Sequence, residues 1–110
     1  MSTRQNKVAK QIQKDIAEIL LNQSQSMAHG KMLTVTGVRI SPDLGVARVY
    51  VSVFPSDNSS QVILTLNEHT HQFRNELARR LKNQLKKMPE VSFFLDDSLD
   101  YLENIENLLK

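Results

Sequence analysis

The sequence predicts an α+β fold in which amphipathic helices pack against one small three-stranded sheet. Apolar residues recur at helical spacing over residues 3–22 and again over 59–88. Between these segments lie two stretches rich in Val, Ile, Thr and Tyr, residues 31–40 and 46–54, which are typical of strands. A third short alternating stretch follows Pro89. A strand, a helical crossover and another strand of one sheet form a right-handed unit, which places helices against the sheet.

The length of 110 residues is that of one domain, so we expect a single unit spanning residues 1–110. The chain has no Cys, which excludes disulfides, thiolate metal sites and thiol nucleophiles and fits a reducing cytoplasm. No apolar run approaches the length of a membrane span. We therefore expect a cytoplasmic protein that does not contact membranes.

The N-terminal segment predicts an amphipathic helix with one basic face. Its apolar stripe recurs at helical steps and comprises Val8, Ile12, Ile16, Ile19 and Leu20. At 100° per residue, Lys7, Lys10 and Lys14 fall together on the side opposite that stripe.

Residues 31–40 and 46–54 predict a β-hairpin, because the linking residues 41–45 combine Pro, Asp and Gly. In the second strand one face is wholly apolar, consisting of Ala47, Val49, Val51 and Val53. In the first strand the alternation changes phase at Gly37. A β-bulge at Gly37 would return both halves of the strand to the same buried face.

The helical pattern over residues 59–88 is too long for one straight helix in a domain of this size, so it should bend. The polar Thr70 and the small Ala78 are candidate bend positions, and we place the bend between Asn75 and Lys82. Pro89 should stop the helix.

Residues 91–95 predict the third strand, and residues 97–110 predict a short acidic C-terminal helix. Up to Met88 the chain carries thirteen basic and six acidic residues, net +7. From Pro89 onward it carries one basic and six acidic residues, net −5. The sequence therefore predicts a basic body with an acidic tail.

No pattern points to a cofactor, a metal or a catalytic centre. The three glycines are too far apart for a nucleotide-binding loop. His69 and His71 would point about 200° apart on a helix, so solvated histidines are favoured over a metal site there. We expect no cofactor, no small-molecule substrate and no enzymatic activity.

A second basic set, Arg79, Lys82 and Lys86, repeats the spacing of the first. Such sets are often only solvated surface, but two of them with few interspersed acids favour phosphate binding if they lie on the same side. The second-choice RNA contacts are Arg4, Arg74, Arg80 and Lys87. Arg74 has an alternative role as the structural partner of an acid. Tyr50 and Phe54 are alternative stacking surfaces, although partial burial is the commoner use of such residues.

Four parts of the chain, in this order and spacing, resemble the bacterial ribosome-binding factor A family. They are the helix from Arg4 to Leu20, the run from Thr34 to Leu44 (TVTGVRISPDL) leading into Ala47 to Ser52 (ARVYVS), the pair Phe73-Arg74, and Pro89 to Phe93 (PEVSF) followed by Asp96-Asp97-Ser98. The resemblance covers essentially the whole chain.

The resemblance implies a KH-like domain of the type II arrangement, with a kinked helix pair that lacks the Gly-x-x-Gly loop. It also implies a non-enzymatic factor that binds the free 30S subunit and 16S rRNA and promotes late maturation and rRNA processing, notably in the cold. Without that loop, shape and charge should carry recognition of RNA.

Two further expectations concern partners. The alternative function is a protein-interaction module that binds a basic ribosomal protein through its acidic C-terminal helix. We expect a monomer, because the sequence has no heptad seam and no long apolar edge.

Overall fold

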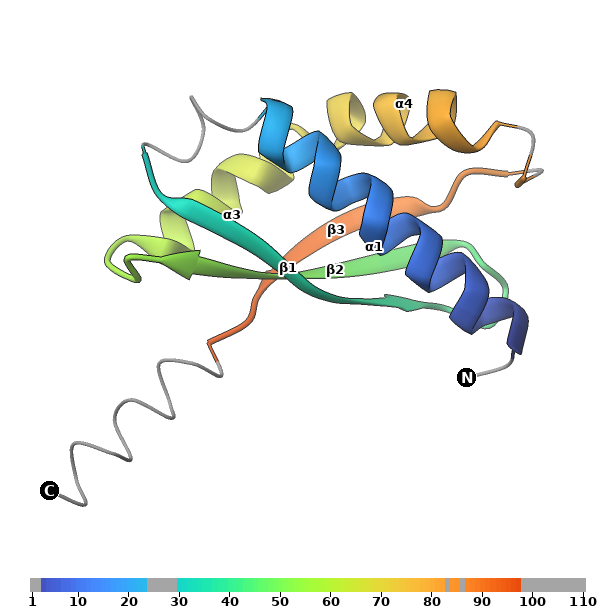
Figure 1. Ribbon diagram of the computed structural model, residues 1–110, viewed down its shortest axis with the longest axis horizontal. Helices are drawn as coiled ribbons and strands as arrows, with labels where there is room; N and C mark the ends of the chain where they lie inside the picture. Colours follow the sequence, from blue (N-terminus) through green and yellow to red (C-terminus); the bar gives the residue numbers. More distant parts are fainter. Residues whose placement is uncertain (1–2, 24–29, 83, 86, 98–110) are drawn as a thin grey trace, which may run out of the picture.

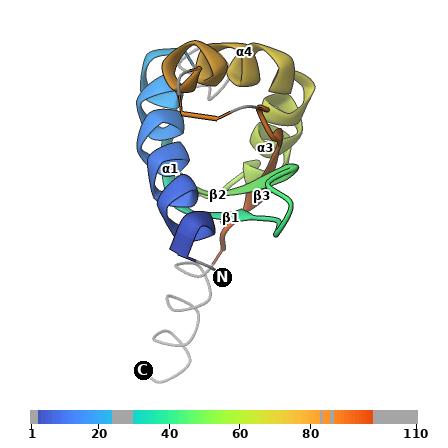
Figure 2. The same cartoon turned by 90° about the vertical axis from the view of Figure 1, so that its right-hand side faces the viewer.

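The computed structural model describes residues 3–23, 30–82, 84–85 and 87–97. The elements are the helix α1 (Thr3–Gln23), the strands β1 (Met32–Ile40) and β2 (Val46–Phe54), the helices α3 (Ser59–Glu68) and α4 (Thr70–Leu81), and the strand β3 (Glu90–Leu95). The sheet has the order β1-β2-β3, with β1 antiparallel and β3 parallel to β2. All three described helices lie on one face of this sheet (Figures 1 and 2). The α+β prediction is confirmed.

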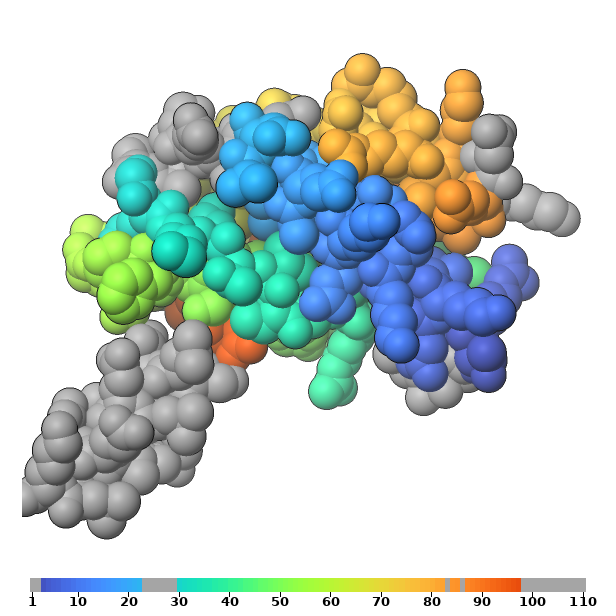
Figure 3. Space-filling model, viewed as in Figure 1, coloured from blue at the N-terminus to red at the C-terminus, as the bar shows by residue number. Residues whose placement is uncertain are grey.

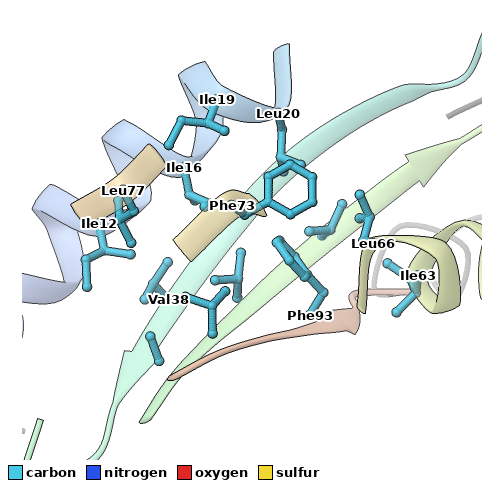
Figure 4. Packing of buried hydrophobic residues seen from close by; sticks show 14 of the residues in the cluster. Ile12, Ile16, Ile19, Leu20, Val38, Ile63, Leu66, Phe73, Leu77 and Phe93 are labelled. Atoms are coloured by element: carbon cyan, nitrogen blue, oxygen red, sulfur yellow. The ribbon is translucent and has the colours of Figure 1, made fainter. Parts of the chain in front are cut away.

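The core lies between the helices and the inner face of the sheet (Figure 4). Ile12 and Ile16 of α1 are fully buried, as the helical stripe predicts. The predicted inner face of β2 is also buried, and it consists of Ala47, Val49, Val51 and Val53. Phe73 of α4 meets Phe93 of β3 edge to face, with ring centroids 5.3 Å apart. This contact fixes α4 over the edge of the sheet.

The bulge predicted at Gly37 is present. Val35 pairs with Val51 and Gly37 with Tyr50, so Thr36 is the extra residue of β1. Beyond the bulge, Val38 and Ile40 are buried, while Val35 before it is partly buried against the same core. The bulge therefore keeps both halves of β1 in contact with the core.

The hairpin turn is closed by its own side chains. The Ser41 hydroxyl accepts hydrogen bonds from the backbone N–H groups of Gly45 and Val46, at 3.1 and 2.9 Å. It donates to the Asp43 carboxylate, which also accepts from Gly45. The Ser41 hydroxyl and then the Gly45 N–H hold the pKa of Asp43 below its usual value.

The long helical pattern breaks at His69, so the bend predicted between Asn75 and Lys82 is wrong. His69 has φ −114° and ψ 21°, outside the helical region. Its backbone N–H donates to Leu66, and its carbonyl accepts from Gln72 and Phe73 as α4 begins. The apolar stripe is interrupted nearby, since the polar Thr70 occupies the position, four residues after Leu66 and three before Phe73, where the stripe would place an apolar residue. Of the two candidate bend positions, Thr70 lies next to the break and Ala78 does not.

The helix predicted up to Met88 ends earlier, at Leu81. The amides of Gln84 and Leu85 both donate to the Leu81 carbonyl, which makes a final turn. Leu85 and Met88 still pack against the core, so the periodicity predicted their burial but not their conformation. The chain has to return to β3, where the Glu90 amide donates to the Gly45 carbonyl. The C-terminal helix predicted over 97–110 lies almost wholly outside the described residues.

Candidate nucleic-acid interface

The basic face of α1 is exposed as predicted. Lys7, Lys10 and Lys14 are all exposed, whereas Ile12 on the opposite side is fully buried. Within the described part of the chain, none of the three lysine side chains forms an ion pair or hydrogen bond. Since no carboxylate of the described residues pairs with them, these side chains leave their charge available to a solvent-side partner.

The second basic set lies at the C-terminal end of α4. Lys82 is exposed, and Arg79 keeps 77% of its side chain exposed although it donates to Glu76 one turn earlier. Lys87 is exposed in the segment that leads to β3. Lys86, the third predicted member of this set, lies outside the described residues.

A hollow lies between α1 and the end of α4, and one member of the first basic set, Lys7, lines it. Lys7, Val8 and Gln11 of α1 line a hollow of about 220 Å³, and its other wall consists of Leu81, Gln84 and Leu85. Figure 3 shows this half of α1 beside the end of α4 on a single face of the molecule. The end of α4 that carries Lys82 thus lies beside α1 (Figure 3), which is compatible with the condition for phosphate binding that both sets lie on the same side. Binding of phosphate by these residues stays a prediction.

Arg80, a second-choice RNA contact, forms ion pairs with two acidic residues of α1. Its Nη1 lies 2.6 Å from Glu18 Oε2 and 3.5 Å from Asp15 Oδ1. Asp15 is only 8% exposed and also accepts a hydrogen bond from Gln11. The bond to Glu18 raises the pKa of the Arg80 guanidinium above its ordinary value, and the bond to Asp15 acts in the same direction. This arginine ties α4 to α1.

Arg74 is held in a similar way, in line with its alternative structural role. Its guanidinium donates to the carbonyls of Met88 and Pro89, at 3.1 and 3.3 Å. Glu90 lies 3.7 Å away and completes the site. Arg74 therefore anchors the segment between α4 and β3. Arg4, by contrast, is exposed in the first turn of α1.

The sequence interpretation missed one pair of exposed cations. Arg39 of β1 and Arg48 of β2 are exposed and directly opposite each other in the hairpin register. Their pairing follows from the bulge at Gly37, because this shift aligns the two strands beyond it. Counting the register through the bulge was the signal that would have found the pair.

Neither histidine of the predicted helix lies in a metal-binding group. The Nδ1–H of His69 donates to the Thr65 carbonyl at 2.8 Å. Across the described ranges, no three His, Asp or Glu side chains lie close enough together to hold a metal ion. The helices of these ranges are also too short or too polar to span a bilayer.

A comparison with protein families identifies the family of this chain. The model of the family described as ribosome-binding factor A matches residues 4–109. The chain belongs to the ribosome-binding factor A family. The resemblance inferred from the sequence is thus confirmed.

Relatives agree with this assignment, and solved structures share the fold. The ribosome-binding factor A of Christiangramia forsetii is 43% identical over 110 residues, covering 99% of this chain and 84% of that protein. The crystal structure of ribosome-binding factor A from Thermus thermophilus superposes with a TM-score of 0.69 at 24% identity, covering 83% of this chain and 94% of that one. A homology model of Thermus thermophilus ribosome-binding factor A, fitted into the cryo-EM map of a 30S complex with that factor, gives a TM-score of 0.64 at 24% identity, covering 81% of this chain and 91% of that one.

The fold shared with these ribosome-binding factors A is KH-like. The order α1-β1-β2-α3-α4-β3, with β3 parallel to β2, is the type II arrangement expected from the sequence. His69 alone separates α3 from α4, and no glycine lies near it. The helix pair is therefore kinked and lacks the Gly-x-x-Gly loop.

Proposed function

We propose that this chain is a non-enzymatic assembly factor that binds the free 30S ribosomal subunit and promotes late maturation and processing of its 16S rRNA. Membership of the ribosome-binding factor A family over residues 4–109 carries the proposal. The Thermus thermophilus member fitted into a 30S complex supports the choice of the small subunit. Because bacterial small subunits are assembled in the cytoplasm, this function places the protein there.

The groove between α1 and α4 is the contact that the geometry favours. Lys7 lines this groove, and the exposed Lys10 and Lys14 of α1 and Arg79 and Lys82 at the end of α4 would neutralise further rRNA phosphates. Side chains of this kind bind the phosphate backbone without specifying its sequence. Without a Gly-x-x-Gly loop to clamp a single strand, recognition rests on the shape and charge of folded rRNA.

Co-sedimentation with purified 30S subunits tests this assignment. We expect K7E/K10E/K14E to weaken binding by about tenfold or more, because three phosphate contacts become repulsive. The matched control K7R/K10R/K14R retains the charges and should bind within about twofold of the wild type. Cells carrying only the reversed variant should accumulate immature small subunits, most severely in the cold.

Thermal unfolding of both variants establishes that they fold, since exposed substitutions of this kind change stability little. A folded K7E/K10E/K14E protein that co-sediments like the wild type would remove α1 from the interface. The alternative partner, a basic ribosomal protein bound to the acidic residues 97–110, stays a prediction, as does the monomeric state.

A further inference from the structure

The face of the sheet opposite the helices carries cations and aromatic rings in adjacent rows. No described helix covers this face (Figure 2). One row across the strands contains Arg39 and Arg48, and the next contains Gly37, Tyr50 and Phe94. Rows two residues apart along a strand are separated by about 7 Å.

The arginine row holds two like charges in direct opposition. Arg39 and Arg48 are exposed, and neither side chain has an ion pair or hydrogen bond to another residue of the described ranges. Like charges directly opposite across two strands destabilise a sheet. An anion placed between the two guanidinium groups would remove this repulsion and accept hydrogen bonds from both.

The aromatic row provides a surface for stacking. Tyr50 and Phe94 have ring centroids 5.7 Å apart and planes inclined by 31°. Phe94 is 42% exposed, which leaves part of its ring open to solvent. Exposed aromatic pairs beside arginines are a common means of binding unpaired bases.

A hollow lies between the two rows because Gly37 has no side chain. It measures about 530 Å³ and is lined by Thr36, Gly37, Val38, Arg39, Tyr50 and Asp96. A Cβ added at Gly37 would meet nothing within 4 Å, so this position faces open space. The Asp96 carboxylate, which accepts a hydrogen bond from Thr36, disfavours a phosphate at its rim but can accept from N–H groups of a base edge, such as N3–H of uracil.

We propose that this face binds single-stranded RNA, with an unpaired base on Tyr50 and Phe94 and the adjacent phosphate between Arg39 and Arg48. The inference rests on the proposed function, to which it adds a second RNA contact on the side of the sheet away from the helices. Asp96 sets the orientation, since it turns the base edge toward itself and the phosphate toward the arginines.

Charge makes RNA a better occupant than a protein surface. An apolar partner would bury two unpaired guanidinium groups, which is costly. A second copy related by a two-fold axis through this face would bring Arg39 and Arg48 toward the same residues of its partner. A phosphodiester strand neutralises the arginines and supplies bases for the rings.

Fluorescence anisotropy with labelled oligouridylate of eight nucleotides tests the proposal on the full chain. R39Q/R48Q and Y50L should each weaken binding about fivefold or more, through lost phosphate and stacking contacts respectively. G37L should also weaken binding about fivefold or more, because the leucine side chain would fill the hollow. The substitution should not disturb the fold, since a Cβ at this position meets no atom within 4 Å. M32L, an exposed position also on this face but at its far end, should bind within about twofold of the wild type.

A charge-matched control separates this site from the α1 face. K10Q/K14Q removes two positive charges from α1 and should reduce oligouridylate binding less than R39Q/R48Q does. Equal losses in the two variants would overturn the proposal, because binding would then follow total charge only. Association of two wild-type copies through this face, seen by light scattering and abolished by Y50L, would also overturn it.

Binding to 30S subunits distinguishes the failure of this inference from the failure of the proposed function. If the wild type binds 30S subunits while its sheet variants keep wild-type affinity for oligouridylate, only the sheet site is wrong. If the wild type does not bind 30S subunits, the proposed function itself is wrong. Ultraviolet crosslinking of oligouridylate should modify Tyr50 or Phe94, and crosslinks confined to α1 would contradict the sheet site.

Discussion

Asp15 and Arg80 show how one cation of a basic helix acquires a structural role. Asp15 lies on the side of α1 that meets Arg80 of α4, where only 8% of the residue is exposed. A carboxylate so poorly hydrated needs a partner, which Arg80 and Gln11 supply. Arg80 is thereby oriented toward α1, with 29% of its side chain exposed, while its neighbour Arg79 remains 77% exposed. Adjacent arginines on one helix thus have different roles.

Replacing Arg80 by Met should lower the free energy of unfolding by about 1–3 kcal/mol. The substitution keeps most of the volume but leaves Asp15 nearly buried and without its cation. Urea unfolding measures the loss. The double variant D15N/R80M should recover part of it, because the neutral amide no longer needs a charge partner. An R80M protein of wild-type stability that has lost 30S binding would make Arg80 an RNA contact instead.

At the scale of elements, Asn67 joins α3 to the free edge of the sheet. Its Nδ2 donates to the Phe93 carbonyl at 2.9 Å, and its Oδ1 accepts from the Phe93 amide at 2.8 Å. β3 pairs with β2 on its other side only, so these groups would otherwise be unpaired on an edge strand. The Asn67 side chain therefore forms the two hydrogen bonds with Phe93 that a further strand would otherwise supply.

The N67A substitution should destabilise the protein by about 1–2 kcal/mol, since two backbone groups of β3 lose their partner. Hydrogen exchange at the Phe93 amide should accelerate in this variant. N75A is the matched control, because Asn75 is exposed on α4 and its side chain forms no hydrogen bond within the described ranges. If exchange at Phe93 were the same in N67A and N75A, the bond to Asn67 would contribute nothing to the edge.

At the scale of the whole molecule, the structural features that the sequence predicted correctly are those that depend on local periodicity. The basic face of α1 and the bulge at Gly37 follow from residues a few positions apart, and both are confirmed. The break at His69 was misplaced because residues 66 and 73 keep helical spacing on both sides of it. The partners of Arg80 lie 62 and 65 positions away in sequence, so spacing alone does not separate it from Lys82.

Salt dependence of 30S binding tests the cationic interface as a whole. If Lys7, Lys10, Lys14, Arg79, Lys82 and Lys86 each neutralise about one phosphate, the logarithm of the affinity should fall with the logarithm of salt concentration with a slope of about −4 to −5. K10Q should make this slope shallower by about 0.7–0.9 without changing which RNA is bound, because a phosphate contact carries no sequence information. Titrations between low and physiological salt measure the slope directly.

Lys31 supplies the matched control for this slope. Its ammonium donates to the Pro55 carbonyl and pairs with Asp57 at 3.1 Å, with only 11% of the side chain exposed. A cation already neutralised within the protein releases no counterion from RNA, so K31Q should leave the slope unchanged. K31Q also removes the ion pair that lowers the pKa of Asp57, and thermal unfolding at neutral pH checks that the variant is folded at the titration temperature. A slope that changes in K31Q but not in K10Q would mean that 30S binding does not pass through the exposed lysines of α1.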